Sequence, residues 1–224
     1  MSIAGAGTGL ILSHGEPGDA GLLGQWLDEH GLRYEVREVS AGPMPRLDDV
    51  AFLVSLGSEE SATDAGLRWV VEEIALMREA RARGIPVLGL CFGGQALSLA
   101  LGGEVTRAST PQIGWLTLSR LTGDVPAGPW FHWHYEQFGL PPGAEPLAQG
   151  ARGLAAFRAG PHVGVQFHPE VTTDAISWWS RASDELARFG IDPAALVAES
   201  ERRAPAARAR AWTLFDAWWA RIGG

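Results

Sequence analysis

The sequence predicts an α/β protein with an open, mostly parallel sheet in three layers, so that helices cover both faces. In the first half of the chain, short apolar runs alternate with longer segments of helical spacing, which is typical of strand–helix–strand units. The apolar runs at residues 51–56 and 86–90 are continuous, as in strands that are buried on both faces. Ligands of such sheets bind outside the carboxyl ends of the strands, so we expect the functional edge there.

Four strands and three helices are predicted in this first half. In order, they are strand 9–13, helix 21–30, strand 34–39, strand 51–56, helix 64–83, strand 86–90 and a helical run over 96–101. Gly31 and Gly84 follow the first two helices, at positions where glycine commonly ends a helix. The second helix has a predicted apolar stripe of Leu67, Val70, Val71, Ile74 and Met77.

A different pattern begins at about Gly102. Short apolar runs between turns that contain Pro or Gly predict an antiparallel extension with strands at 115–118, 130–133, 154–158 and 163–167. Helices are then predicted at 173–189, 193–203 and 206–222. The last helix has an aromatic stripe that we expect to pack on the core, formed by Trp212, Phe215, Trp218 and Trp219. We therefore predict a main domain over residues 1–190 and a helical extension over 191–224 that packs on it.

Composition excludes several classes of protein. Of the 224 residues, 46% are hydrophobic, which is ordinary for a globular protein. The formal net charge is −8 and no basic block is present, so we expect no nucleic-acid partner. Cys91 is the only cysteine, so it cannot form an internal disulfide. Residues 1–5 do not begin a signal peptide and no apolar run is long enough to cross a membrane, so we expect a cytoplasmic protein.

The segment 89–95, with the sequence GLCFGGQ, places this cysteine between a predicted strand and a predicted helix. A side chain at such a tight turn projects from the end of the sheet beside a helix N-terminus. The N–H groups and the dipole of a helix end favour an anion there. The same strand–turn–helix arrangement presents the nucleophile of serine hydrolases. We therefore predict that Cys91 is a nucleophile and not a buried structural thiol.

A second segment, 165–170, offers a base and an orienting group for that nucleophile. It is an apolar strand that ends in His168, Pro169 and Glu170. If the strand continues, His168 and Glu170 point the same way, so the carboxylate can hold the imidazole. His168 would take the thiol proton and later protonate the leaving amine. Cys91, His168 and Glu170 thus form a predicted catalytic triad.

Together the two motifs resemble the class I, or triad-type, glutamine amidotransferase family. GLCFGGQ at 89–95 and QFHPE at 166–170 occur in the family's order and at a plausible separation. The segments 131–134 and 138–141 are also similar to stand-alone members related to the GMP-synthase amidotransferase domain. The resemblance covers roughly residues 8–180 and implies a flavodoxin-like core.

The resemblance implies that Cys91 attacks the side-chain amide of glutamine, which leaves a γ-glutamyl thioester and releases ammonia. It implies that the backbone N–H groups of Gly57 and Phe92 form the oxyanion hole. The residues that it implies for substrate contact are Gln95, Ser58, Trp133, His134 and Tyr135. No cofactor and no metal are implied. His132 and His134 alternate with tryptophan, but no further Cys or His completes a zinc ligand set.

One loop departs from the family pattern. The loop after the strand at 51–56 often reads Gly-Gly-Pro in this family, whereas residues 55–61 here read SLGSEES. Gly57 keeps a small residue where the backbone must approach the substrate. The missing proline and the carboxylates of Glu59 and Glu60 leave the oxyanion geometry and the choice of substrate open.

Three functions therefore remain open. The first is a glutaminase-type amidotransferase that supplies ammonia to a separate synthetase or acceptor subunit, since the chain has no P-loop pattern. The second is a hydrolase of γ-glutamyl peptides or conjugates that uses the same triad. The third is a non-catalytic binding protein on the same fold, which the presence of all three triad residues argues against. The sequence identifies neither the acceptor nor the oligomeric state.

Overall fold

The computed structural model describes residues 7–15, 19–119 and 121–223. The segment 1–5, which does not resemble a signal peptide, lies outside these residues. Seven strands form one large sheet. In spatial order they are β2 (Tyr34–Glu38), β1 (Thr8–Ser13), β3 (Val50–Ser55), β4 (Val87–Leu90), β9 (His162–Val165), β8 (Gly153–Ala159) and β7 (Glu145–Gly150). Two further strands, β5 (Val105–Thr117) and β6 (Pro129–Phe138), form a separate antiparallel pair.

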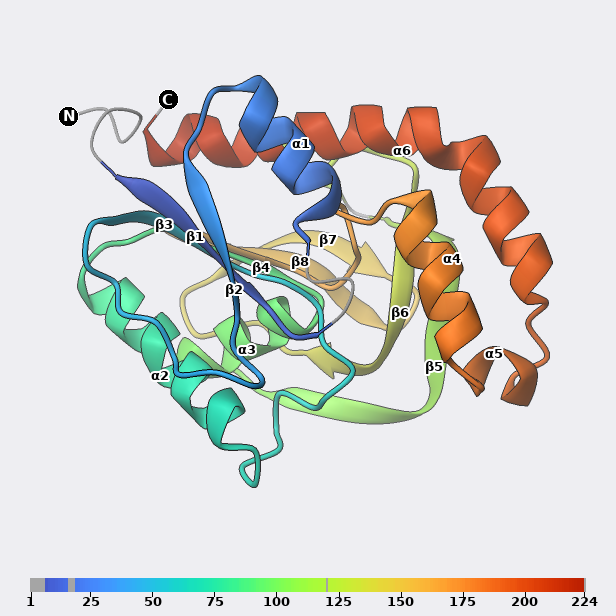
Figure 1. Cartoon of the computed structure of the whole chain (residues 1–224), viewed down its shortest axis with the longest axis horizontal. Coiled ribbons are helices and arrows are strands. Elements are labelled where there is room, and N and C mark those ends of the chain that lie inside the picture. Colours follow the sequence, from blue (N-terminus) through green and yellow to red (C-terminus); the bar gives the residue numbers. More distant parts are fainter. Residues whose placement is uncertain (1–6, 16–18, 120, 224) are drawn as a thin grey trace.

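The first five strands in this spatial order run parallel, from β2 to β9. The last two, β8 and β7, continue the sheet in antiparallel pairing. Because parallel strands end at the same edge, the residues that follow β1, β3, β4 and β9 meet there. The two-stranded β5–β6 sheet stands beside this edge, between β8 and α4 in the view of Figure 1.

Helices lie on both faces of the large sheet. They are α1 (Gly21–Glu29), α2 (Arg68–Ala82), α3 (Phe92–Ala100), α4 (Thr173–Ala182), α5 (Glu185–Arg188) and α6 (Pro193–Ile222). Helices α1 and α6 cover one face, and α2 and α3 cover the other (Figure 1). Within the described ranges, no helix has the length and apolar character needed to cross a membrane. The three layers confirm the predicted α/β fold with its mostly parallel sheet and antiparallel extension.

Helix α6 differs most from the prediction, because one helix of 30 residues replaces the two expected on either side of Pro205. Proline has no N–H, so it removes one hydrogen bond of the helix and favours a bend. Figure 1 shows α6 bent as it rounds the edge of the molecule. Tertiary packing on both sides of the bend keeps the two halves helical, since each half has buried residues such as Leu196 and Phe215.

Three smaller differences have local causes. The helix predicted over 173–189 is divided into α4 and α5 by an extended residue, Ser183. Strand β7 was not predicted, because its sequence EPLAQG contains Pro and Gly, which are confined largely to edge strands. In α2, the predicted stripe is wrong at one point: Val71 is 48% exposed, whereas Glu73 is fully buried.

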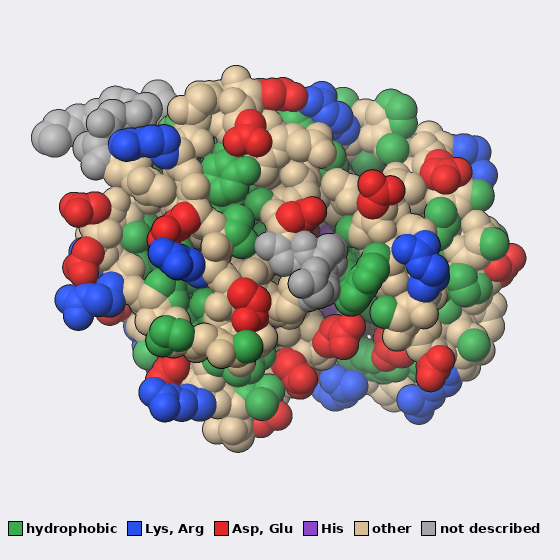
Figure 2. Space-filling model, in the orientation of Figure 1, with side chains coloured by type: hydrophobic (Ala, Val, Ile, Leu, Met, Phe, Trp, Pro, Cys, Tyr) green, Lys and Arg blue, Asp and Glu red, His purple; other side chains and the backbone are tan. Residues whose placement is uncertain are grey.

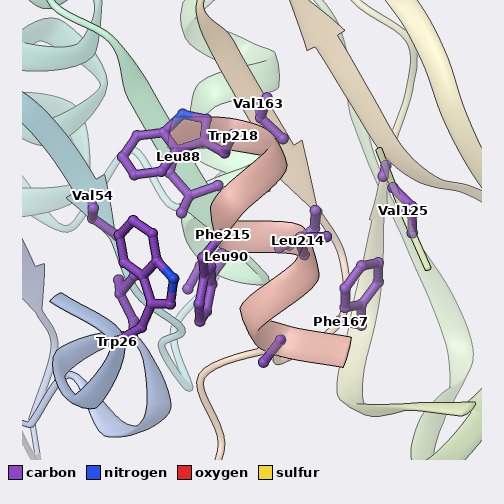
Figure 3. Packing of buried hydrophobic residues seen from close by; sticks show 14 of the residues in the cluster. Trp26, Val54, Leu88, Leu90, Val125, Val163, Phe167, Leu214, Phe215 and Trp218 are labelled. Atoms are coloured by element: carbon purple, nitrogen blue, oxygen red, sulfur yellow. The ribbon is translucent and has the colours of Figure 1, made fainter. Parts of the chain in front are cut away.

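The core between the sheet and helices α1 and α6 is rich in aromatic side chains. Trp26 of α1 packs against Phe215 of α6, with 5.9 Å between the ring centroids. Trp218 of α6 packs edge-on against Phe52 of β3, with 5.6 Å between the ring centroids. Figure 3 shows these α6 side chains among Val54, Leu88 and Leu90 of the sheet. The C-terminal helix therefore closes one face of the same core that carries β3 and β4.

We predict that residues 191–224 unfold together with the rest of the chain. Phe215→Ala removes a ring that is fully buried, so it should lower the free energy of unfolding by about 3–5 kcal/mol. Thr213→Ala, on the exposed side of the same helix, should change it by less than about 0.5 kcal/mol. Urea titrations followed by tryptophan fluorescence and by far-UV circular dichroism measure both effects. Two separate transitions in the wild-type protein would show instead that α6 folds independently.

Candidate active site

Cys91 occupies the turn between β4 and α3. Its backbone has a φ of 52° and a ψ of −107°, a conformation that residues with a side chain rarely adopt. Its N–H donates to the Val165 carbonyl oxygen at 2.9 Å, and its carbonyl accepts from the Gln95 N–H at 3.1 Å. Strand β9 and helix α3 thus hold the strained turn that carries the thiol.

Three glycines allow α3 to approach the sheet closely at this turn. A Cβ atom on Gly93 would lie 2.1 Å from the Ser55 carbonyl oxygen, and one on Gly94 would lie 2.6 Å from the Val165 carbonyl oxygen. A Cβ atom on Gly89 would lie 2.3 Å from the Gly93 carbonyl oxygen. These contacts are with backbone atoms, which cannot swing away, so a side chain at any of the three positions would push α3 off the ends of β3 and β9.

His168 and Glu170 follow β9 and form a close pair. The Nδ1 atom of His168 lies 2.7 Å from a carboxylate oxygen of Glu170, and both side chains are buried. The strand ends at Val165, so the contact does not arise from the strand alternation that the sequence indicated. Backbone hydrogen bonds fix the conformation of this segment instead. The His168 N–H donates to the Phe131 carbonyl of β6 at 2.8 Å, and the Leu22 N–H of α1 donates to the Glu170 carbonyl at 2.7 Å.

The electrostatics of this pair favour a protonated imidazole. Burial by itself lowers the pKa of His168. The negative charges of Cys91 and Glu170, together with their hydrogen bonding to the ring, outweigh this effect, so the pKa lies well above its ordinary value. Because Glu170 accepts from Nδ1–H, the proton that can be exchanged is on Nε2. That nitrogen is buried and makes no hydrogen bond of good geometry with the described residues. The imidazole is therefore oriented on one side and free to react on the other.

The sulfur of Cys91 has two polar neighbours besides His168. It lies 3.9 Å from the Trp133 carbonyl oxygen of β6 and 3.9 Å from Nε2 of Gln166. The Gln166 side chain in turn accepts weakly from the Phe138 N–H at 3.4 Å. The sequence did not single out Gln166 for a role, although it lies within the QFHPE motif.

The Gly57 turn forms the wall opposite the cysteine helix. A Cβ atom on Gly57 would lie 2.8 Å from Cε1 of His168, so only glycine fits there without moving the imidazole. The carbonyl before this residue, that of Leu56, accepts the Gly93 N–H of α3 at 3.1 Å. Neither the Gly57 N–H nor the Phe92 N–H has an acceptor within the described residues. Two N–H donors are thus available beside the thiol, one on each side.

All five residues expected to contact a substrate lie at the same cavity. Gln95 is buried, and its side-chain amide donates to the Glu136 carbonyl at 3.1 Å. Ser58, Trp133, His134 and Tyr135 line the cavity from the Gly57 loop and from β6.

The two alternating histidines of β6 form a neutral pair. His132 and His134 lie 3.1 Å apart at their nearest ring nitrogens. Burial lowers the pKa of His134 to about 4, and burial with the neighbouring histidines lowers that of His132 well below its ordinary value. Within the described ranges, no group of three or more His, Cys, Asp or Glu side chains is arranged to hold a metal ion.

The cavity also contains residues that the sequence did not point to. Glu136 of β6 accepts a hydrogen bond from the Ser61 hydroxyl at 2.6 Å and lies 3.6 Å from the Arg107 guanidinium. This network ties the Gly57 loop to the two-stranded sheet. Glu136 is the one acidic residue of β6, whose sequence is PWFHWHYEQF, and this is the signal in the sequence that could have drawn attention to it.

The cavity has a volume of about 880 Å³, in the range of about 300–1,000 Å³ usual for sites that enclose a drug-sized ligand. Arg107 is the only arginine among the described residues that line it. The lining carboxylates are Asp19, Glu59, Glu60, Glu136, Glu170, Asp184 and Glu185. Figure 2 shows acidic side chains gathered around the middle of this face, where histidine is also visible. The cavity thus brings the Cys91 thiol next to an acidic and aromatic wall.

Comparison with known proteins agrees with this geometry. The model of the family "Glutamine amidotransferase class-I" matches residues 29–176. A glutamine amidotransferase from Methylobacillus flagellatus has a similar structure, with a TM-score of 0.87 and 26% sequence identity, over 98% of this chain and 96% of that one. A glutamine amidotransferase from Thermotoga maritima gives a TM-score of 0.86 and 25% identity, over 96% of this chain and 98% of that one.

A glutamine-hydrolysing GMP synthase from Nitrosomonas eutropha is 39% identical over 106 residues, which is 40% of this chain and 20% of that protein. The chain spans about a fifth of the length of such curated relatives, so the match concerns one part of them. The family match extends over more than half of the chain and includes the cysteine turn, the Gly57 loop and the His168–Glu170 segment. The chain belongs to the class I glutamine amidotransferase family.

Proposed function

We propose that this protein hydrolyses the side-chain amide of glutamine through a γ-glutamyl thioester on Cys91 and releases ammonia to a separate acceptor enzyme. The observation that carries the proposal is the arrangement of a strained cysteine turn, a buried His168–Glu170 pair and the Gly57 turn around one cavity. Among the described residues, the N–H groups of Gly57 and Phe92 have no acceptor. A nucleophile, an oriented base and oxyanion donors are what acyl transfer requires.

In the first half of the reaction, the thiolate of Cys91 attacks the amide carbon and the C=O double bond becomes a C–O⁻ bond. The N–H groups of Gly57 and Phe92 stabilise that oxyanion. His168, which holds the thiol proton as an imidazolium, then donates it to the amide nitrogen, the C–N bond breaks and ammonia leaves. Glu170 keeps the imidazole in the orientation that presents Nε2 to the reacting atoms.

In the second half, water replaces ammonia. The neutral His168 takes a proton from a water molecule, and the resulting hydroxide attacks the thioester carbon. The C–S bond breaks and glutamate leaves, which restores the thiolate–imidazolium pair. Gln95, Ser58, Trp133, His134 and Tyr135 would hold the amino-acid end of the substrate, since they line the remaining walls of the cavity.

A second function, hydrolysis of a γ-glutamyl conjugate, is favoured by one observation. The cavity of about 880 Å³ is larger than a glutamine side chain needs, and its lining includes Trp178, Trp179 and Asp184. Trp179 packs edge-on against His168, with 5.1 Å between the ring centroids. The larger volume leaves room for an organic group on the amide nitrogen, and aromatic rings with carboxylates would favour an apolar or cationic group there. The same thioester chemistry would then release an amine in place of ammonia.

We predict that 6-diazo-5-oxonorleucine, an electrophile derived from glutamine, labels Cys91 and stops glutamine hydrolysis. Mass spectrometry of the digested protein locates the label, and a coupled glutamate assay measures the activity. Cys91→Ser should remove both the label and all but a trace of activity, because serine at this position is a far weaker nucleophile. A label that persists in Cys91→Ser, or a wild-type protein that hydrolyses neither glutamine nor a γ-glutamyl amide, would contradict the proposal.

We also predict that Glu170→Gln lowers the pKa of His168 and reduces kcat by about 10- to 100-fold. The Glu170 carboxylate raises the pKa of His168. Without it, the imidazolium should lose its proton at a lower pH than in the wild-type protein. Histidine ring NMR of the wild-type and variant proteins measures the pKa of His168. Glu185→Gln is the matched control, because Glu185 lines the same cavity but bonds to the Trp133 indole. An unchanged pKa in Glu170→Gln would remove Glu170 from its assigned role.

A third prediction separates the two functions. We expect the wild-type enzyme to hydrolyse free glutamine with a kcat/KM at least equal to that for γ-glutamyl amides of primary amines, measured as glutamate formed. A preference for a γ-glutamyl amide of more than about tenfold in kcat/KM would replace the first function by the second. Both assays measure the glutamate that is formed, so the same detection method serves for either leaving group.

A further inference from the structure

A second buried histidine–carboxylate pair lies directly behind the Gly57 turn. His14 follows β1, and its Nε2 atom lies 2.7 Å from a carboxylate oxygen of Glu73 in α2. Both side chains are fully buried. The other carboxylate oxygen of Glu73 accepts the hydroxyl of Ser55, the last residue of β3, at 2.6 Å. The pair therefore connects β1, α2 and the end of β3 beneath the turn.

The second ring nitrogen of His14 reaches the turn itself. Its Nδ1 atom lies 3.0 Å from the Gly57 carbonyl oxygen. A carbonyl oxygen can only accept, so Nδ1 carries a hydrogen and donates it. The rings of Trp69 and Phe92 pack on His14 at centroid distances of 5.0 and 4.9 Å and prevent it from rotating away.

The surroundings of His14 favour its charged form. Burial lowers the pKa of His14, but the charge and hydrogen bond of Glu73, the Gly57 carbonyl and the more distant charge of Glu38 together raise it above the ordinary value. As an imidazolium, His14 has an N–H on both ring nitrogens, which matches one carboxylate and one carbonyl acceptor. Breaking either contact would leave a buried charge without its full set of partners.

Together with α3, this histidine fixes the two peptide groups on either side of the Gly57 Cα atom. The Leu56–Gly57 peptide, which contains the Gly57 N–H, is held through the Leu56 carbonyl, which accepts the Gly93 N–H. The Gly57–Ser58 peptide is held through the Gly57 carbonyl, which accepts from His14. Glycine has no side chain to restrict its dihedral angles, so only such outside contacts can hold its N–H in one direction. In a planar trans peptide, fixing a carbonyl also fixes the N–H that follows it.

We propose that His14 and Glu73 are positioning residues that keep the Gly57 turn in the conformation in which its N–H can stabilise the oxyanion. This inference rests on the proposed function, because it takes the Gly57 N–H as an oxyanion donor. His14 borders the cavity, but both side chains are fully buried, so we assign them an action through the backbone of the turn. The chain thus has one His–Glu pair for proton transfer and another for the geometry of the oxyanion hole.

Two substitutions at His14 separate its two contacts. The amide nitrogen of asparagine can take the place of Nδ1, so His14→Asn keeps a donor for the Gly57 carbonyl. The longer glutamine side chain reaches the place of Nε2, so His14→Gln keeps the contact with Glu73 and loses the one with Gly57. His162→Gln is the matched control, since His162 is also buried but begins β9 at the end away from the site.

We expect His14→Gln to lower kcat for glutamine by about 10- to 100-fold with KM within about twofold, since an oxyanion donor is worth about 100- to 1,000-fold in kcat. His14→Asn should stay within about fivefold of the wild-type kcat, and His162→Gln should match the wild type. Alkylation of Cys91 by iodoacetamide forms no oxyanion, so its rate should be unchanged in all three variants. If His14→Gln does not fold, Glu73→Gln, which keeps the size of the side chain, should reduce kcat without changing the alkylation rate.

Other results would overturn the inference. A His14→Gln variant that keeps the wild-type kcat, or one in which kcat and the alkylation rate fall together, would show that His14 does not act through the oxyanion hole. Equal kcat values for His14→Asn and His14→Gln would show that the Gly57 contact is irrelevant. A wild-type protein without hydrolytic activity would instead reject the proposed function, and the role of His14 with it.

Discussion

The close approach of helix α3 to the ends of β3 and β9 is the constraint on which the site depends. Three glycines permit it, because each lies where a Cβ atom would collide with backbone. The approach forces Cys91 into a positive φ and brings the first N–H groups of α3 against the neighbouring loops. One of them, from Gly93, holds the Leu56 carbonyl. The strained turn at Cys91 and the opposite wall of the site are therefore consequences of the same packing.

Two His–Glu pairs with similar contacts have different surroundings at this edge of the sheet. His168 is bonded to Glu170 on one side only, and its other nitrogen lacks a well-formed partner among the described residues. His14 is bonded on both sides, to Glu73 and to the Gly57 carbonyl. A histidine with a free nitrogen can exchange a proton, whereas one with both nitrogens engaged is suited to holding structure. Their surroundings, more than their residue types, distinguish the two pairs.

The sequence predicted the large sheet well, because continuous apolar runs such as 51–56 depend little on their neighbours. The ends of the runs 51–56 and 86–90 could also be assigned to one edge, since parallel strands end together. The strand before His168 was instead assigned to the antiparallel extension, whereas β9 pairs parallel with β4. The sequence could not indicate the single helix α6, because Pro205 breaks the local signal and packing on the sheet restores the helix. The burial of Glu73 could not be predicted either. A glutamate in a helix normally faces solvent, and Glu73 is buried against a histidine 59 residues earlier in the chain.

The division of the site between two sheets bears on how the protein can diversify. The thiol, the imidazole and the Gly57 turn follow strands of the large sheet, whereas Trp133, His134 and Tyr135 belong to the β5–β6 pair, which is a separate sheet. The backbone of β6 is tied to the reactive centre, because the Phe131 carbonyl accepts the His168 N–H and the Phe138 ring lies next to Gly94. A change of side chain at Tyr135, by contrast, can reshape the cavity wall while the backbone of β6 and the glycine contacts of α3 stay in place.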